Sequence, residues 1–172
     1  MSIQNLILVG PMGVGKTTVG KALAKVTGRE FVDLDQEIEY RTGVSIPTIF
    51  DIEGEDGFRK RETEIIQEYT DKSNLVIATG GGAVGRSENR KAITRSALVI
   101  YLKAPVEVLI QRTRNNRNRP LLNDRDPAST LINLMEEREP LYQEVADIVI
   151  EVDDRAPGSL CKRIVKQIEE IT

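Results

Sequence analysis

The sequence predicts an α/β fold with three layers (α/β/α), in which helices cover both faces of a five-stranded parallel sheet. Three observations support this fold class. Short apolar runs alternate with segments of helical periodicity along the 172 residues, which is the pattern of parallel strands joined by helices. Two of these runs are followed directly by glycine-rich loops. No repeat, low-complexity tract or linker interrupts the pattern, so we expect residues 1–172 to form a single domain.

The first apolar run and the loop after it form a phosphate-binding motif. Leu6–Val9 is continuously apolar, as expected for a strand buried on both faces. Gly10–Thr18 then fits G-x-x-x-x-G-K-[ST], in which backbone N–H groups surround an anion, the lysine reaches the β- and γ-phosphates and the hydroxyl joins a Mg²⁺ shell. Apolar residues recur at helical spacing from Val19 to Val26, and Gly28 ends the helix. The order strand, loop, helix predicts a nucleotide site.

The next segment brings two acidic residues close together. Glu30–Asp35 is predicted as a second strand, whose alternation would direct Asp33 and Asp35 to the same side. Asp35 also fits the N-cap of a helix beginning at Gln36. A ligand-facing acid and a plain helix cap are both compatible with this pattern.

A helical region follows Gly43, which ends the preceding short helix. We expect one helix over Ile46–Glu55, an acidic turn over Glu53–Gly57, and a longer helix from Phe58 onward. In the longer helix Glu62 is within reach of Arg59 at the i,i+3 spacing. By itself this charged stretch is typical of a solvated helix face.

A second glycine-rich loop follows the third predicted strand, Leu75–Ala78. Gly80, Gly81 and Gly82 leave room for a ligand to approach the backbone closely. In open α/β sheets ligands bind beyond the carboxyl ends of the strands, where this loop and the first one would meet. The alternative is a flexible connection with no function.

The remaining elements continue the alternation of strands and helices. Pro105 opens one helix, Asp126 and Pro127 start another, and Glu139-Pro140 is predicted to stop it. The last helix is expected to face inward through Leu160, Ile164, Ile168 and Ile171. The other predicted elements are a helix over 87–94, a strand over Leu98–Leu102 and a strand over Ile148–Ile150.

Arg112–Pro120 carries four arginines and three asparagines but no apolar side chain large enough to anchor it. We therefore expect a mobile basic loop. Such a loop closes over phosphates in phosphoryl-transfer proteins. Alternatively, it is an exposed loop that only adds solubility.

Composition excludes several function classes. The net charge is −3, which argues against broad nucleic-acid binding, and the absence of histidine excludes catalysis or metal ligation by that residue. No apolar run approaches the roughly 20 residues of a membrane span, and the N-terminus does not resemble a signal peptide. The single cysteine, Cys161, fits a reducing compartment and a packing role. We expect a cytoplasmic protein.

A nucleotide loop by itself fits a GTPase, an ATPase motor, a regulatory sensor or a small-molecule kinase. The Asn-Lys-x-Asp segment that specifies guanine is absent, and a motor usually needs a larger chain. A compact domain with a basic loop favours a kinase of a small metabolite.

Six segments in order resemble the shikimate kinase family over nearly the whole chain. They are Gly10–Thr18, Phe31–Glu39, Gly57-Phe58-Arg59 with Glu62, Thr79–Gly82, Arg119-Pro120-Leu121-Leu122 and Arg138-Glu139-Pro140-Leu141-Tyr142. The resemblance implies a P-loop kinase fold, with a substrate-binding segment near 33–62 and a lid near 112–124. It implies transfer of the γ-phosphoryl of ATP to the 3-hydroxyl of shikimate, in the biosynthesis of chorismate and aromatic amino acids.

The resemblance also assigns roles to individual residues. The implied catalytic residues are Lys16, Asp35 and Arg119, where Asp35 orients the substrate hydroxyl and is a candidate base. The implied ATP site comprises Gly13, Val14, Gly15, Lys16, Thr17, Thr18, Arg112, Arg119, Arg155 and Pro157. Implied shikimate contacts are Asp35, Arg59, Gly80, Gly81, Gly82 and Arg138, with Glu62 orienting Arg59. Thr17 would bind Mg²⁺ directly and Asp33 through water.

Two alternatives remain at this point. A related kinase of gluconate or another hydroxy acid would share the nucleotide loop, without needing both Asp35 and the pair of arginines. A noncatalytic nucleotide-binding module would be expected to have lost some of these acids or arginines. The predicted ligands are thus ATP, Mg²⁺ and shikimate, with no nucleic acid or membrane partner, and the chain is expected to be a monomer.

Overall fold

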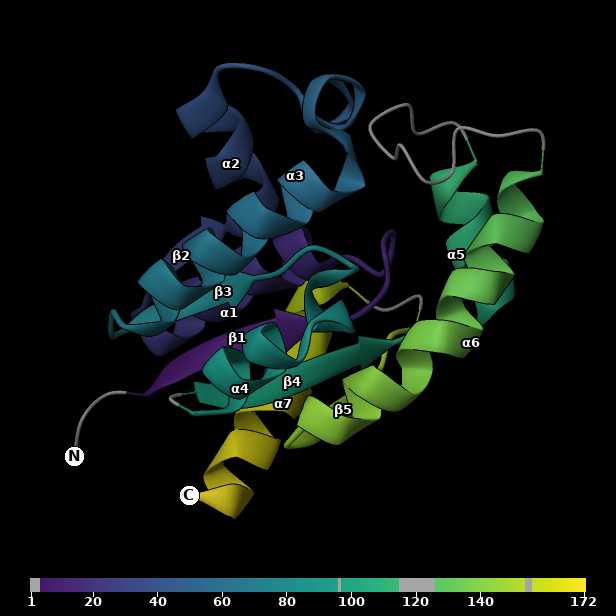
Figure 1. The fold of residues 1–172 in the computed structure, drawn as a ribbon. Helices are drawn as coiled ribbons and strands as arrows, with labels where there is room; N and C mark the ends of the chain where they lie inside the picture. The colour runs from purple at the N-terminus through teal and green to yellow at the C-terminus, as the bar shows by residue number, and fades with distance from the viewer. Residues whose placement is uncertain (1–3, 96, 115–125, 154–155) are drawn as a thin grey trace.

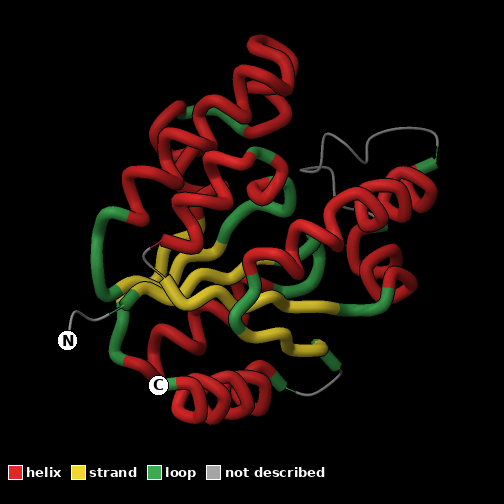
Figure 2. The backbone as a smooth tube through the Cα atoms, turned by 60° about the horizontal axis from the view of Figure 1, so that its bottom comes forward, coloured by secondary structure: helices red, strands yellow, loops and turns green. Residues whose placement is uncertain are grey.

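The computed structural model of the chain describes residues 4–95, 97–114, 126–153 and 156–172. Its centre is a five-stranded parallel sheet in the order β2-β3-β1-β4-β5. The strands are β1 (Asn5–Val9), β2 (Glu30–Asp33), β3 (Leu75–Ala78), β4 (Ala97–Lys103) and β5 (Ile148–Glu151). The predicted α/β class with a five-stranded parallel sheet is confirmed, and Figure 2 shows the sheet between layers of helices.

Helices cover both faces of the sheet (Figure 1). One face packs against α1 (Lys16–Thr27), α5 (Val106–Thr113) and α7 (Pro157–Ile171). The other face packs against α2 (Leu34–Thr42), α3 (Ile46–Thr70), the 3-10 helix η1 (Ala83–Gly85) and α4 (Ser87–Arg95). Helix α6 (Pro127–Val145) contributes to both clusters. None of the helices in the described part of the chain is long and apolar enough to cross a membrane.

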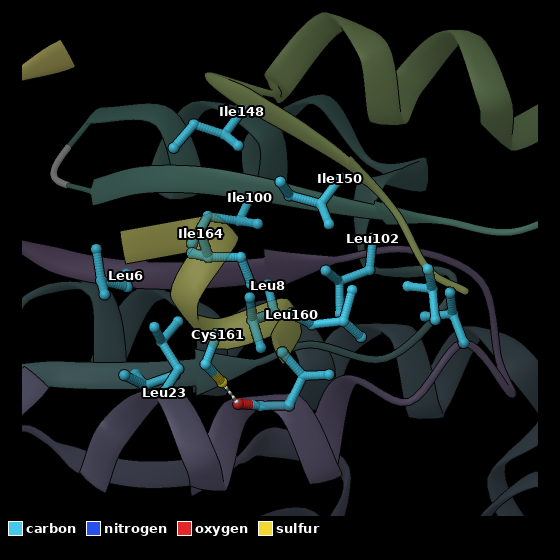
Figure 3. Packing of buried hydrophobic residues seen from close by; sticks show 14 of the residues in the cluster. Leu6, Leu8, Leu23, Ile100, Leu102, Ile148, Ile150, Leu160, Cys161 and Ile164 are labelled. Atoms are coloured by element: carbon cyan, nitrogen blue, oxygen red, sulfur yellow. Dashed lines mark hydrogen bonds between the residues drawn. The ribbon is translucent and has the colours of Figure 1, made fainter. Parts of the chain in front are cut away.

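Successive residues of each strand point to opposite faces, which divides the core into two clusters. In β1, Leu6 and Leu8 belong to the cluster against α1 and α7, whereas Ile7 and Val9 belong to the other. Figure 3 shows the first cluster, in which buried Cys161 lies with its Sγ 3.6 Å from the carbonyl oxygen of Val19. The cysteine has the packing role expected for it.

The order of the strands places a crevice at the carboxyl edge of the sheet. Strands β1 and β3 are neighbours, with Leu8 paired to Ala78. The helices that follow them, α1 and α4, lie on opposite faces. The chain therefore leaves the two strands in opposite directions, which is the arrangement that opens a ligand-binding crevice in such folds.

The predicted strand over Glu30–Asp35 is too long. Strand β2 ends at Asp33, and α2 begins at Leu34. Asp33 is the N-cap of α2, because its Oδ1 accepts a hydrogen bond from the backbone N–H of Gln36 at 3.1 Å. Asp35 is thus neither a strand residue nor the cap, but belongs to the first turn of the helix.

The two helices predicted around residues 46–70 form one element with a sharp kink. Gly54 has φ 74° and ψ 177°, outside the helical region, and marks the position where we expected an acidic turn. Glycine accepts this positive φ because it lacks a Cβ. Ser45 caps the start of α3 by accepting from the N–H of Thr48.

The predicted stop at Glu139-Pro140 is wrong, since α6 continues through Pro140 to Val145. The side chains after the proline explain the continuation. Tyr142 and Val145 are buried against the sheet, so their packing outweighs the helix-breaking preference of proline. Two apolar residues that the helical spacing placed on buried faces are exposed instead. Val26 is 63% exposed, and Ile171, predicted to face inward, is 54% exposed near the end of α7.

Candidate active site

The glycines of the nucleotide loop adopt backbone conformations that residues with a Cβ rarely take. Gly10, Gly13 and Gly15 all have positive φ, at 149°, 84° and 100°. A Cβ at Gly10 would lie 2.5 Å from the carbonyl oxygen of Leu102, so no other residue fits there without a shift. In this structure the Nζ of Lys16 donates to the carbonyl oxygens of Gly10 (2.6 Å) and Pro11 (2.9 Å), so the ammonium lies within the loop.

The start of α1 and the end of β2 bring two hard oxygen ligands together. The hydroxyl of Thr17 donates to Oδ2 of Asp33 at 2.6 Å. Magnesium is usually held by one or two such groups together with substrate phosphates and water. The described residues contain no group of three or more acidic, histidine or cysteine ligands, so an all-protein metal cage is not found there. The Thr17–Asp33 pair fits a Mg²⁺ ion that is bound mainly by nucleotide and water.

The loop after β3 lies against three other elements, and its glycines permit this close packing. A Cβ at Gly80 would be 2.8 Å from Oδ1 of Asp35 and 3.0 Å from Oε2 of Glu62. A Cβ at Gly82 would be 2.6 Å from both Nη atoms of Arg59. The loop is anchored at Thr79, whose hydroxyl and N–H both donate to the carbonyl oxygen of Leu8.

Gly81 is the point where α6 meets this loop. A Cβ there would lie 3.4 Å from Nη1 of Arg138, which is 8% exposed. The hydroxyl of Tyr142, one turn further along α6, donates to the carbonyl oxygen of Gly81 at 2.5 Å. The loop thus gathers Asp35, Arg59 and Arg138 from α2, α3 and α6.

Arg59 is held by two carboxylates of its own helix. Its Nη1 lies 3.1 Å from Oε1 of Glu62, and its Nη2 lies 3.4 Å from Oε1 of Glu55. The ion pair with Glu62 expected from the sequence is therefore present. Burial raises the pKa of Glu62, while the nearby guanidinium of Arg59, followed by those of Arg138 and Arg86, acts to lower it. The carboxylate is thus a buried group whose charge depends on the surrounding arginines.

The residues expected from the resemblance to lie on the adenine side are described only in part. Arg112 lies in the last turn of α5 rather than in a loop, and its Nη1 donates to the carbonyl oxygens of Gly13 (3.3 Å) and Val14 (3.4 Å). Pro157 is the first residue of α7. Arg119 and Arg155, and the predicted lid from residue 115 to 124, lie outside the described residues.

The two loops and α2 line much of an open cavity of about 370 Å³. Its lining joins the nucleotide loop to the acidic and glycine-rich segments: Gly13, Gly15, Lys16, Thr17, Thr18, Asp33, Asp35, Gln36, Glu39, Ile46, Thr79, Gly80, Gly81 and Arg112. Four of these residues, Gln36, Glu39, Ile46 and Thr79, were not among the predicted site residues. A helix starting at Leu34 would have indicated Glu39, because Asp35 and Glu39 are then spaced i,i+4 on one face.

The fold and the cavity define a class of protein, the P-loop kinases. A phosphate-binding loop, a Thr–Asp pair that fits magnesium and the acidic side chain of Asp35 line one cavity. Arg59 and Arg138 are not part of that lining but lie against the adjoining glycine loop, at Gly82 and Gly81. The family model "Shikimate kinase" matches residues 12–169. The chain therefore belongs to the shikimate kinase family, whose members are ATP-dependent phosphotransferases. The resemblance read from the six sequence segments is confirmed.

Individual relatives agree with this assignment. The shikimate kinase of Pseudomonas savastanoi pv. phaseolicola is 52% identical over 98% of this chain and 98% of its own length. The solved structure of shikimate kinase from Acinetobacter baumannii in complex with shikimate has a TM-score of 0.97 and 48% identity, covering 99% of this chain and 95% of that one.

A gluconokinase from Sinorhizobium meliloti is similar in fold alone. Its structure has a TM-score of 0.59 at 17% identity, covering 98% of this chain and 97% of that one. The similarity supports a common kinase fold. It gives no support to the alternative substrate, gluconate.

Proposed function

We propose that the chain transfers the γ-phosphoryl of ATP to the 3-hydroxyl of shikimate, forming shikimate 3-phosphate and ADP. One observation carries this proposal. The nucleotide loop and the glycine loop line one cavity together with Asp35, and the same glycine loop lies against Arg59 and Arg138. An acid and two guanidinium groups suit a substrate with hydroxyls and one carboxylate, which is the chemistry of shikimate.

On the nucleotide side, the loop Gly13–Thr18 holds the phosphates through backbone N–H groups at the start of α1. Lys16, which now bonds to loop carbonyls, turns toward the β- and γ-phosphates when they are present. Thr17 would hold Mg²⁺ directly and Asp33 through water, and the ion when bound neutralises phosphate charge. Arg112, at the carbonyls of Gly13 and Val14, borders the adenine side.

On the substrate side, Arg59 and Arg138 bind the carboxylate, because a planar guanidinium matches a carboxylate with two parallel hydrogen bonds. Glu62 keeps Arg59 oriented through their ion pair. The backbone of Gly80, Gly81 and Gly82 contacts the substrate ring. Asp35 accepts a hydrogen bond from the 3-hydroxyl.

The chemical step forms a bond between the 3-oxygen and the γ-phosphorus and breaks the bond from that phosphorus to the bridging oxygen of ADP. Because the transition state of phosphoryl transfer is loose, alignment and charge stabilisation matter more than early deprotonation. Asp35 therefore acts first by orienting the hydroxyl and then receives its proton. Lys16 and Arg119 stabilise the charge on the transferring group; for Arg119 this role rests on the sequence.

A monomeric state and a cytoplasmic location are part of the same proposal. They rest on the compact single domain and on the single, buried cysteine. Light scattering coupled to size-exclusion chromatography would test the monomer, since a particle mass near the 19.2 kDa of the chain is expected.

The direct test is ADP release from Mg²⁺-ATP with shikimate, run beside quinate and gluconate at equal concentrations. Turnover that depends on shikimate supports the reaction and the substrate together. ADP release with gluconate alone would overturn the substrate while leaving the nucleotide site intact. ATP binding without turnover on any of the three would favour the noncatalytic alternative.

A further inference from the structure

The glycine loop after β3 is held by carbonyl hydrogen bonds, and one of them differs from the others. The carbonyl oxygen of Gly80 accepts from the N–H of Ala83 at 3.1 Å. Gly82 accepts from the N–H of Gly85 at 3.0 Å, and Ala83 accepts from Nδ2 of Asn89 at 2.9 Å. These three bonds are local in sequence. Only the Gly81 carbonyl, among these four, is bonded by a distant element, through the hydroxyl of Tyr142 in α6.

Tyr142 is well suited to fix a position. Its side chain is 1% exposed, and its ring stacks on that of Tyr101 in β4, with centroids 5.0 Å apart. Tyr101 is itself buried, and its hydroxyl donates to Oε2 of Glu139. The Tyr142 hydroxyl is therefore held between the sheet and α6, and cannot follow a displacement of the loop.

Arg138 precedes Tyr142 by one helical turn, so both side chains lie on the same face of α6. Gly81 meets both: its carbonyl oxygen accepts from the Tyr142 hydroxyl, and the position of a Cβ at Gly81 lies 3.4 Å from Nη1 of Arg138. Burial raises the pKa of Tyr142 to about 12, although the Arg138 guanidinium acts to lower it, so the phenol keeps its proton for donation.

We propose that Tyr142 is a positioning residue that sets the spacing between the glycine loop and Arg138. This role rests on the proposed function, in which Arg59 and Arg138 form a clamp for the carboxylate of shikimate. Tyr142 would keep the glycine loop at the distance from Arg138 that the clamp needs. Three consecutive glycines have little intrinsic preference for one conformation, so the loop needs an external anchor. Displacing Gly81 would also displace Gly80 from Asp35 and Gly82 from Arg59, the contacts described above.

The test compares Tyr142→Phe with Tyr101→Phe. Both changes remove one buried hydroxyl and keep the stacked rings, so they should lower the melting temperature to a similar extent. Glu139 retains Gln143 and Lys103 as partners when Tyr101 loses its hydroxyl, which makes Tyr101→Phe a matched control. We expect Tyr142→Phe to raise the KM for shikimate about tenfold, the usual effect of one lost hydrogen bond, with the KM for ATP nearly unchanged. Tyr101→Phe should leave both KM values within about twofold of wild type.

A second measurement does not depend on the substrate. Amide hydrogen exchange over residues 79–86 should become faster in Tyr142→Phe than in Tyr101→Phe, because only the former releases the loop. Equal exchange in the two variants would overturn the proposal, even if shikimate is the substrate. Faster exchange in Tyr142→Phe in an enzyme that does not phosphorylate shikimate would support the anchor and overturn the proposed function instead. Equal KM values for shikimate in the two variants would also overturn the positioning role.

Discussion

The carboxylate of Glu62 contacts Arg59 with one oxygen and the glycine loop with the other. Its Oε1 lies 3.1 Å from Nη1 of Arg59, and its Oε2 lies 3.0 Å from the position of a Cβ at Gly80. The side chain is 2% exposed, whereas that of Arg59 is 14% exposed. A buried acid therefore holds the more accessible guanidinium of Arg59 beside the glycine loop.

Glu62→Gln should weaken shikimate binding. The amide keeps a hydrogen-bond acceptor for Arg59 but loses the charge, so we expect the KM for shikimate to rise about tenfold. The KM for ATP should change less than about twofold, because Glu62 lies against Arg59 and Gly80 and does not line the cavity beside the nucleotide loop. Glu64→Gln, an exposed change on the same helix, is the control. Initial-rate kinetics check this, and an equal rise in both KM values would contradict the assigned role.

The same residue should shape the dependence of stability on pH. Burial raises the pKa of Glu62 above its ordinary value of 4.5, against the opposing effect of Arg59. The folded state then binds a proton more tightly than the unfolded state, so the contribution of Glu62 to stability is present below the unfolded pKa and is lost as the pH rises. We expect the free energy of unfolding of wild type, relative to Glu62→Gln, to decrease as the pH rises above the ordinary pKa of 4.5. Urea denaturation of both proteins at several pH values measures this difference in the free energy of unfolding. A difference that does not change with pH would refute the prediction.

Lys16→Ala should mainly lower kcat, by about 100-fold, because it removes a cation from the developing charge on the phosphoryl group. The fold should persist, since the ammonium donates to the carbonyl oxygens of Gly10 and Pro11 within the loop and is not part of the hydrophobic core. Lys21→Ala, on an exposed position of the same helix, should keep wild-type turnover. Steady-state rates with circular dichroism as a folding check give the answer, and unchanged turnover in Lys16→Ala would remove Lys16 from the site.

Arg138→Ala should raise the KM for shikimate about 100-fold, because charge-assisted hydrogen bonds contribute more than neutral ones. Arg138→Lys should have a smaller effect, since the ammonium keeps the charge without the planar fork. Arg95→Ala, which removes an exposed arginine paired with Asp71, serves as the control. Kinetics with shikimate and ATP varied in turn distinguish the roles. Comparable increases for both substrates would eliminate the clamp assignment.

Gly80→Ala should lower kcat/KM for shikimate at least about tenfold, because accommodating a crowded methyl group in a packed site typically costs about 1–3 kcal/mol. The methyl would meet Asp35 at 2.8 Å and displace its carboxylate. Gly85→Ala is a close control, because its Cβ would meet nothing within 4 Å. Steady-state kinetics of the two variants give kcat/KM for shikimate. Similar kcat/KM values in Gly80→Ala and Gly85→Ala would contradict the prediction that the position of the Asp35 carboxylate matters.

The sheet and both loops could be predicted because their signals are local. Apolar runs such as Leu6–Val9 and Leu75–Ala78 match the buried strands, and the glycine spacing of the first loop is dictated by phosphate geometry. The packing of Gly80 against Asp35 could not be predicted in this way. This packing depends on the order of the strands, because β2 and β3 are neighbours in the sheet and so bring together Asp35 and Gly80, which are 45 residues apart in the sequence.

Two predicted element boundaries are wrong because a specific hydrogen bond or buried contact outweighs the local preference of the sequence. The sequence favours a strand through Asp35, but the hydrogen bond from the N–H of Gln36 to Asp33 starts the helix two residues earlier. Proline predicts a helix end at Pro140, but the buried contacts of Tyr142 outweigh that preference. Arg119 and Arg155 stay predictions of the sequence.

Pro140 leaves one turn of α6 with fewer helical hydrogen bonds than the rest of the helix. Because proline has no N–H, the carbonyl of Glu136 receives no helical bond from position 140. Bending α6 at this turn therefore breaks no hydrogen bond at that position, unlike bending elsewhere in the helix. Arg138 and Tyr142 lie beside this weak turn, and Tyr142 is tied to Gly81. The arm of α6 that begins at Pro127 is packed into the core through Leu131, so side-chain packing, and not a complete set of helical hydrogen bonds, keeps the two parts of α6 aligned.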